Sequence, residues 1–178
     1  MAACGAPTAG GGASTTAAST TAASTTAAST TTSAPAASTA AVTVAEQLRF
    51  SAKTVDGADF SGESLAGKPA VLWFWAPWCP KCQREAPGIA STAKSATSVT
   101  FLGVAALDKE PAMREFVQRF GLGGFTHLAD LDSAVWKRFG VTAQPAYAFI
   151  GRDGEVEVET SQLSEQELKD RVAALAGA

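Results

Sequence analysis

Charged residues are absent from the first quarter of the chain. No Lys, Arg, Asp or Glu precedes Glu46, although the 178 residues include 14 basic and 17 acidic ones. This segment is almost entirely Ala, Gly, Ser, Thr and Pro, and it repeats a pentad that first reads Ala-Ser-Thr-Thr-Ala at residues 13–17. A five-residue period matches neither a helical face nor a strand face, and such small side chains cannot offset the entropy lost on ordering. We therefore expect a disordered tether over residues 1–42 and one folded domain over residues 43–178.

Long hydrophobic segments and basic clusters are also missing. The longest apolar run, residues 69–79, is far shorter than the ~20 residues that a transmembrane helix needs. The sequence shows no secretory signal with a basic start and an apolar centre. A net charge of −3 without a basic stripe argues against a nucleic-acid partner.

Metal ligands are scarce. The chain has three cysteines, at positions 4, 79 and 82, and a single histidine, His127. A structural zinc site takes about four such ligands. Because Cys4 lies in the uncharged tail, too few ligands remain in the folded part, and we expect no bound metal.

Cys4 follows one apolar residue and two small ones, in the order Met-Ala-Ala-Cys. This order resembles the end of a bacterial lipoprotein signal, in which the cysteine receives lipid. The alternative is a stray cysteine in an Ala-rich tail. Because a tether directly after an anchoring residue makes mechanical sense, we expect lipid on Cys4 and attachment to the cell membrane on its extracytoplasmic side.

Hydrophobic patterning predicts alternating strands and helices after the tail. Residues 70–75 are continuously apolar, as in a central strand covered on both faces, and a helix should begin at Pro80 and kink at Pro87. Apolar runs and turn residues predict further strands at 47–52, before a turn at Asp56-Gly57, and at 100–106, 146–150 and 155–159. Caps and apolar spacing predict helices from Pro111 to Gly121, over 133–139 with Asp132 as cap, and from the capping box of Ser164 and Glu167. This order predicts a mixed α/β sheet flanked by helices.

Cys79 and Cys82 lie three residues apart, between the buried strand and the helix that follows it. The free N–H groups and partial positive charge of a helix N-terminus stabilise a thiolate, and Lys81 adds a full positive charge. We therefore expect Cys79 to be the exposed nucleophile. Cys82, one turn deeper, should be more buried and should resolve the mixed disulfide. A purely structural disulfide at this spacing would constrain little chain.

Residues 74–82, Phe-Trp-Ala-Pro-Trp-Cys-Pro-Lys-Cys, resemble the active-site signature of the thioredoxin superfamily. The resemblance is closest to the extracytoplasmic TlpA/DsbE-like branch, which Glu85, Pro87 and the segment Val-Thr-Ala-Gln-Pro at residues 141–145 also match. It covers about residues 46–178 and implies the thioredoxin fold.

The same resemblance implies how substrate binds. Pro145 should be cis and should face the cysteines. The backbone of Gln144 should pair with a substrate peptide, and Trp78 should lie where such a peptide reaches Cys79.

Three residues separate the chain from neighbouring families. Cytoplasmic thioredoxins carry a buried aspartate at the position of Trp73, where it helps to move the proton of the second cysteine; here Glu85, one turn after Cys82, is the candidate carboxylate. Ala76 replaces the threonine of peroxiredoxins. Related copper-delivery proteins pair a histidine with a Cys-x-x-x-Cys spacing, whereas His127 accompanies a shorter one.

These features predict an enzyme, an extracytoplasmic protein thiol–disulfide oxidoreductase that needs no cofactor beyond its redox-active cysteine pair. We favour oxidation of thiols in secreted proteins. A reductase of particular disulfides, as in cytochrome c maturation, remains the alternative, and a non-enzymatic copper-binding module is the less favoured third. The expected partners are cysteine-containing secreted or membrane proteins, a membrane redox protein for recycling, and the membrane itself.

A lipid on Cys4 has a direct consequence for fractionation. The native protein should partition with membranes, because acyl chains bury apolar surface in the bilayer, and Cys4→Ser should release it into the soluble fraction on an immunoblot. Cys79→Ser, which changes a different cysteine, should leave the partition unchanged. A native N-terminus upstream of Cys4, found by mass spectrometry, would contradict the lipid anchor.

Overall fold

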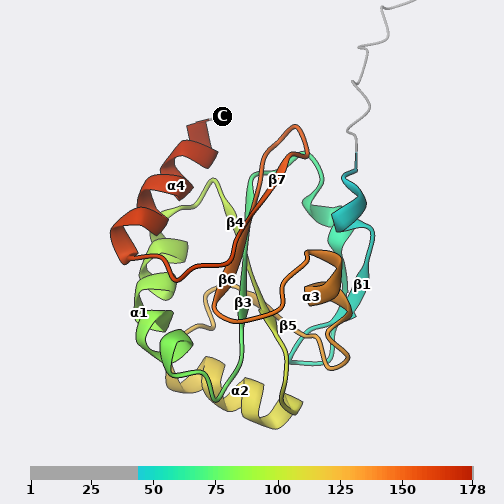
Figure 1. The fold of residues 1–178 in the computed structure, drawn as a ribbon, viewed down its shortest axis with the longest axis vertical. Helices are drawn as coiled ribbons and strands as arrows, with labels where there is room; N and C mark the ends of the chain where they lie inside the picture. Colours follow the sequence, from blue (N-terminus) through green and yellow to red (C-terminus); the bar gives the residue numbers. More distant parts are fainter. Residues whose placement is uncertain (1–43, 178) are drawn as a thin grey trace, which may run out of the picture. The chain divides into compact units, whose positions relative to one another are not determined.

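The computed structural model describes residues 44–177, so the tether and Cys4 lie outside the described residues. The central sheet of this part has the strand order β5-β4-β3-β6-β7 (Figure 1). In that order, the strands span Thr126–Ala129, Thr100–Ala105, Ala70–Trp75, Ala146–Ile150 and Val156–Glu159. β3, β4 and β5 are parallel, whereas β6 and β7 are antiparallel to their neighbours, so the sheet is mixed as predicted.

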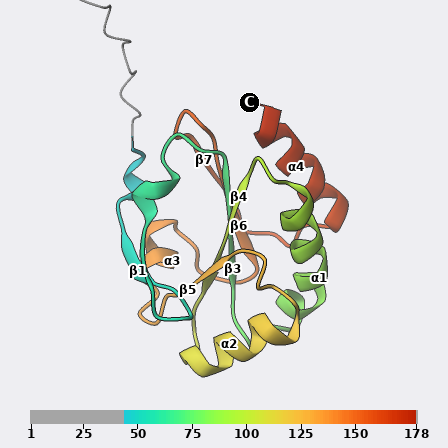
Figure 2. The ribbon, with the colours of Figure 1, turned by 180° about the vertical axis from the view of Figure 1, so that it is seen from behind.

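Helices and a small hairpin cover both faces of this sheet (Figures 1 and 2). One face packs against α1, α2 and α4, which span Pro80–Ser95, Glu110–Arg119 and Glu165–Gly177. The other face packs against α3 and the hairpin of β1 and β2, which span Ala134–Arg138, Ser51–Lys53 and Asp59–Ser61. This is the thioredoxin fold that the sequence predicts. No helix within residues 44–177 is long and apolar enough to span a bilayer.

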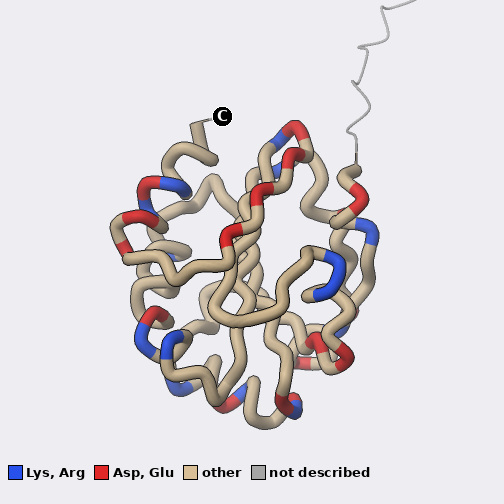
Figure 3. Tube along the Cα trace, viewed as in Figure 1, with Lys and Arg blue, Asp and Glu red and all other residues tan. Residues whose placement is uncertain are grey.

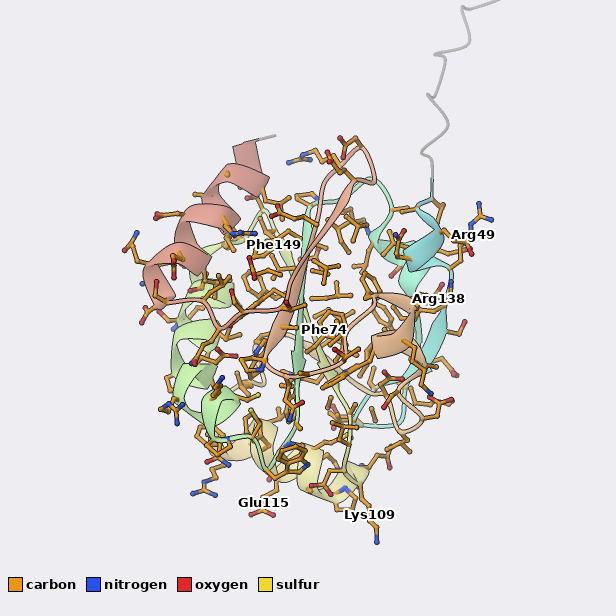
Figure 4. The ribbon with its side chains drawn as sticks, in the orientation of Figure 1. Arg49, Phe74, Lys109, Glu115, Arg138 and Phe149 are labelled. Atoms are coloured by element: carbon orange, nitrogen blue, oxygen red, sulfur yellow. The ribbon has the colours of Figure 1, made fainter. Side chains whose placement is uncertain are left out.

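β3 is the centre of the domain because all six of its residues are buried. It pairs with β4 on one side and with β6 on the other, so every backbone polar group has a possible partner inside the sheet. Trp73 and Trp75 face the core under α1 and α2, and Phe74 faces the core under α3 (Figure 4). Figure 3 shows where the positions of charged residues fall along the chain trace, and Lys109 and Glu115 point away from α2 (Figure 4).

The start of the folded domain differs from the prediction. A 3-10 turn occupies Glu46–Leu48, and β1 begins only at Ser51, so a single strand over 47–52 is wrong. Leu48 is completely buried in the core under α3, and its N–H donates to the carbonyl of Ala45 at 3.0 Å. Burial of this one side chain outweighs the strand propensity of its neighbours. The short strands β2 and β5 were not predicted.

The helix ends follow the predicted signals with one addition. In the capping box of α4, the backbone N–H of Ser164 donates to Glu167 at 2.8 Å, and the N–H of Glu167 donates to the Ser164 hydroxyl at 3.2 Å. Asp132 accepts one N–H at the start of α3, as predicted, at 3.2 Å. Asp130, which the sequence did not single out, accepts two more, from the N–H groups of residues 135 and 136, at 3.1 and 2.9 Å. α1 continues through Pro87 to Ser95.

His127 lies on β5 with only 3% of its surface exposed. Its Nε2 donates to the carbonyl of Leu122 at 3.0 Å, while Nδ1 has no partner among the described residues. The imidazole packs directly against Gly103 of β4. A Cβ added at Gly103 would lie 2.0 Å from Nδ1, so no larger residue fits there without a shift. Burial lowers the pKa of His127 to about 4. β5 is an edge strand of the central sheet, so His127 lies on the outermost strand of that sheet.

This burial predicts an acid-sensitive stability. The unfolded chain takes up the His127 proton near pH 6.5, whereas the folded chain takes it up only near pH 4. Stability should therefore fall as the pH drops through this window, by about 3 kcal/mol in total. Urea unfolding between pH 7.5 and 4 measures the loss. His127→Gln keeps an amide donor for Leu122 but cannot titrate, so its curve should lack this component; an identical pH slope in both proteins would contradict the assignment.

Candidate active site

The cysteines occupy the junction between β3 and α1. Cys79 is the N-cap of α1 and Pro80 is the first helical residue, as predicted. The backbone N–H of Cys82 donates to Cys79 Sγ at 3.2 Å. A sulfur at this position lies in the positive field of the helix N-terminus, and a direct N–H donor stabilises its thiolate further. Both cysteines are free thiols in the structure.

The two sulfurs differ in exposure less than the sequence predicts. Cys82 is fully buried, as expected, but Cys79 is only 3% exposed and is therefore not the open nucleophile that was predicted. The chain turns just before this cysteine, and the Cys79 N–H donates to the carbonyl of Ala76 at 3.1 Å. Burial, followed by the contact with Cys79, raises the pKa of Cys82. Lys81, by contrast, is exposed on the first turn of α1.

Glu85 lies one turn after Cys82 on the same face of α1, as i and i+3 residues do. Its Oε1 accepts a hydrogen bond from Trp73 Nε1 at 2.7 Å, while its Oε2 is buried without a hydrogen-bond partner among the described residues. Burial raises the pKa of Glu85, and its negative charge contributes to the raised pKa of Cys82. The predicted replacement carboxylate is thus coupled to the second cysteine, and Trp73 is its hydrogen-bond donor.

A pocket of about 220 Å³ opens beside Glu85, between α1 and the start of α4. Tyr147 of β6 also lines it. Burial and the charge of Glu85 raise the pKa of Tyr147. Tyr147 was not predicted as a site residue, although its position two residues after Pro145, on the predicted strand, is a usable signal.

Exposed apolar side chains follow the carboxyl ends of the three parallel strands. Trp78 follows β3 and is 53% exposed, Leu107 follows β4 and is 49% exposed, and Leu131 follows β5 and is 61% exposed. Trp78 Nε1 donates to the carbonyl of Leu107 at 3.0 Å, and Leu107 has a φ of +63°, a region that a branched residue rarely adopts. Large apolar residues in loops are a usable sequence signal for Leu107 and Leu131, which the sequence analysis missed.

The bond between Gln144 and Pro145 is cis, as predicted. Pro145 is buried and Gln144 is half-buried. The next residue, Ala146, pairs with Phe74 near the carboxyl end of β3. The cis bond therefore lies at the same end of the sheet as the turn that leads from β3 to the cysteines.

His127 does not form part of a recognisable metal site. Its ring packs against Trp75 and Phe125, with ring centroids 5.7 and 4.4 Å away, and its Nε2 is engaged by a carbonyl. Within residues 44–177, no group of three or more His, Cys, Asp or Glu side chains could hold a metal ion.

Known proteins with the same features are thiol–disulfide oxidoreductases. Residues 44–159 match the AhpC/TSA family. The soluble secreted antigen MPT53 of Mycobacterium tuberculosis is 47% identical over 138 residues, which cover 76% of this chain and 79% of MPT53. The structure of MTB DsbF in mixed oxidised and reduced forms has 60% identity and a TM-score of 0.74, over 75% of this chain and 99% of DsbF.

A secreted M. tuberculosis disulfide oxidoreductase, described as homologous to E. coli DsbE, has 46% identity and a TM-score of 0.71, over 73% of this chain and 98% of its own. The family match, over residues 44–159, includes the junction of β3 and α1. The chain belongs to the AhpC/TSA family of the thioredoxin superfamily and is a thiol–disulfide oxidoreductase.

Proposed function

We propose that this protein oxidises thiols of secreted proteins outside the cytoplasm through Cys79 and Cys82. The observation that carries the proposal is the hydrogen bond from the Cys82 N–H to Cys79 Sγ at the start of α1. A donor at this sulfur stabilises the reduced form as a thiolate, and stabilising the reduced form makes the disulfide more oxidising. The secreted relatives support an extracytoplasmic location.

The oxidation proceeds by two exchanges. A client thiolate attacks Cys79 Sγ of the Cys79–Cys82 disulfide, and Cys82 leaves as a thiolate that takes up a proton. A second client thiolate then attacks the client sulfur of the mixed disulfide, and Cys79 leaves. The client gains a disulfide, the enzyme becomes a dithiol, and a membrane redox partner must remove two electrons to recycle it.

The client segment must lie on the surface around Cys79. Trp78 and Leu107 offer apolar area there, and the backbone of Gln144 next to cis Pro145 offers hydrogen bonds to an extended chain. An unfolded segment with apolar residues near its cysteine fits this surface. We further propose that lipid on Cys4 keeps the domain at the membrane, close to its recycling partner.

The reverse direction is the second candidate. A reductase needs Cys82 to attack the mixed disulfide, and this buried thiol must first lose its proton. The charge of Glu85 contributes to the raised pKa of Cys82, and Glu85 lines a pocket, which supports a role for Glu85 as the acceptor of that proton. The reduction potential of the cysteine couple decides between the two directions.

The first test identifies the attacking sulfur. Cys82→Ser should trap mixed disulfides with client proteins, because the resolving thiol is gone, whereas Cys79→Ser should trap few. Non-reducing gels followed by mass spectrometry identify the trapped species. Equal trapping by the two variants would contradict the proposed roles.

The second test addresses the charge beside Cys79. Lys81→Glu should make the couple less oxidising, because the Cys79 thiolate loses its nearby positive charge. Since Lys81 is exposed, we expect a shift of only about 10–20 mV toward negative potential. Equilibration with glutathione buffers measures the potential.

Lys94→Glu is the matched control for this charge change, because Lys94 is an exposed lysine in the last turn of the same helix. Its potential should equal that of the unaltered protein. A shift in potential as large in Lys94→Glu as in Lys81→Glu would contradict a local effect of Lys81 on Cys79. A couple in the unaltered protein more reducing than the glutathione pool would favour the reductase.

A further inference from the structure

A part-buried hydrogen bond between side chains joins the central strand to the helix of the cysteines. Trp73 Nε1 on β3 donates to Glu85 Oε1 on α1 at 2.7 Å, and Trp73 is fully buried. A carboxylate that leaves water requires compensating donors, and a short bond from an N–H to an ionised oxygen is among the stronger ones. The indole therefore stabilises the ionised form of Glu85 in a site that otherwise favours the protonated form.

The surroundings of Glu85 offer few other donors. On α1, the charged or titratable neighbours are Lys81, Cys82 and Arg84; Tyr147 approaches from β6, and Glu165 of α4 lines the same pocket. Burial raises the pKa of Glu85, and the bond from Trp73 is the largest of the opposing effects, ahead of Tyr147 and of the two cations. No salt bridge to Glu85 is formed within the described residues.

We propose that Trp73 is a positioning residue that keeps Glu85 ionised and thereby controls proton transfer to and from Cys82. The inference rests on the proposed exchange chemistry at Cys79 and Cys82. The Trp73 bond occupies Oε1 and leaves Oε2 as the free oxygen of the carboxylate. Trp73 cannot itself transfer a proton, but its indole supports the transfer by holding Glu85.

The proton balance holds in both directions. When Cys82 attacks the mixed disulfide at Cys79, its thiol proton passes to ionised Glu85, the Cys79–Cys82 bond forms and the client leaves as a thiolate. When Cys82 is instead expelled from the disulfide, protonated Glu85 returns the proton. The pocket of about 220 Å³ beside Glu85 has room for water that exchanges this proton with solvent.

The experiment compares two tryptophans on the same strand. Trp73→Phe removes the donor to Glu85. Trp75→Phe is the matched control, because Trp75 is equally buried, stacks on Trp73 with ring centroids 5.6 Å apart, and has an Nε1 without a partner among the described residues. The two variants lose the same atoms from the same core, and only one of them loses a hydrogen bond to the carboxylate.

Two measurements apply to each variant. Infrared titration of the carboxyl stretch, assigned by its absence in Glu85→Gln, gives the Glu85 midpoint. Reduced protein mixed with oxidised glutathione and quenched with acid at each pH gives, by mass spectrometry, the rate at which Cys82 resolves the mixed disulfide.

Trp73→Phe should raise the Glu85 midpoint, and the midpoint of the pH profile of the resolution rate, by about one pH unit each. It should also slow resolution roughly tenfold on the acid side of that profile. Trp75→Phe should move neither midpoint. In a Glu85→Gln background, Trp73→Phe should add no further pH dependence. Unmoved midpoints in Trp73→Phe, or equal shifts in both variants, would overturn the positioning role.

Two further observations keep the result unambiguous. If Trp73→Phe does not fold, a tryptophan isostere with sulfur in place of the indole N–H, incorporated at position 73, removes only the donor and must give the same upward shift. If the unaltered protein forms no mixed disulfide at Cys79, the proposed exchange chemistry fails, whereas the infrared midpoint still shows whether Trp73 controls Glu85.

Discussion

The complete burial of β3 is the constraint on which the rest of the domain depends. A strand covered on both faces must pair on both edges and receive helices from both sides, and here β4, β6, α1 and α3 meet these needs. The chain leaves this strand directly into the turn that carries Cys79. The position of the reactive sulfur is therefore fixed by the best-packed element of the fold, and its chemistry by the helix start that follows.

Three polar side chains inside the domain make different kinds of hydrogen bond. Asp130 accepts two backbone N–H groups of α3. His127 donates to one carbonyl and Glu85 accepts one indole N–H, and each keeps a second polar atom without a partner among the described residues. The bonds of Asp130 and His127 are local, and each joins a strand or a loop to a segment that is near it in the sequence. The bond of Glu85 joins β3 to α1 and, in the proposed proton transfer, acts on a group that gains and loses a proton.

The sequence predicts the elements whose signals are local. The apolar run of β3, Pro80 at the start of α1, and the capping box of α4 each depend on neighbouring residues, and all three were predicted correctly. The cis bond before Pro145 came from family resemblance. What the sequence did not provide depends on long-range packing: the turn that buries Leu48, the enclosure of Cys79, and the bond between residues 73 and 85, which only the docking of α1 on β3 creates.

The apolar residues at the carboxyl ends of the parallel strands lie on connections rather than on the strands themselves. Loops accept changes in length and sequence more readily than the elements they join. Substitutions at Leu107 would thus alter the proposed client surface while the packing of β3 and α1 stays unchanged. A proposed client surface on loops, beside cysteines that follow a fully buried strand, would let client preference change without a change in the sulfur chemistry.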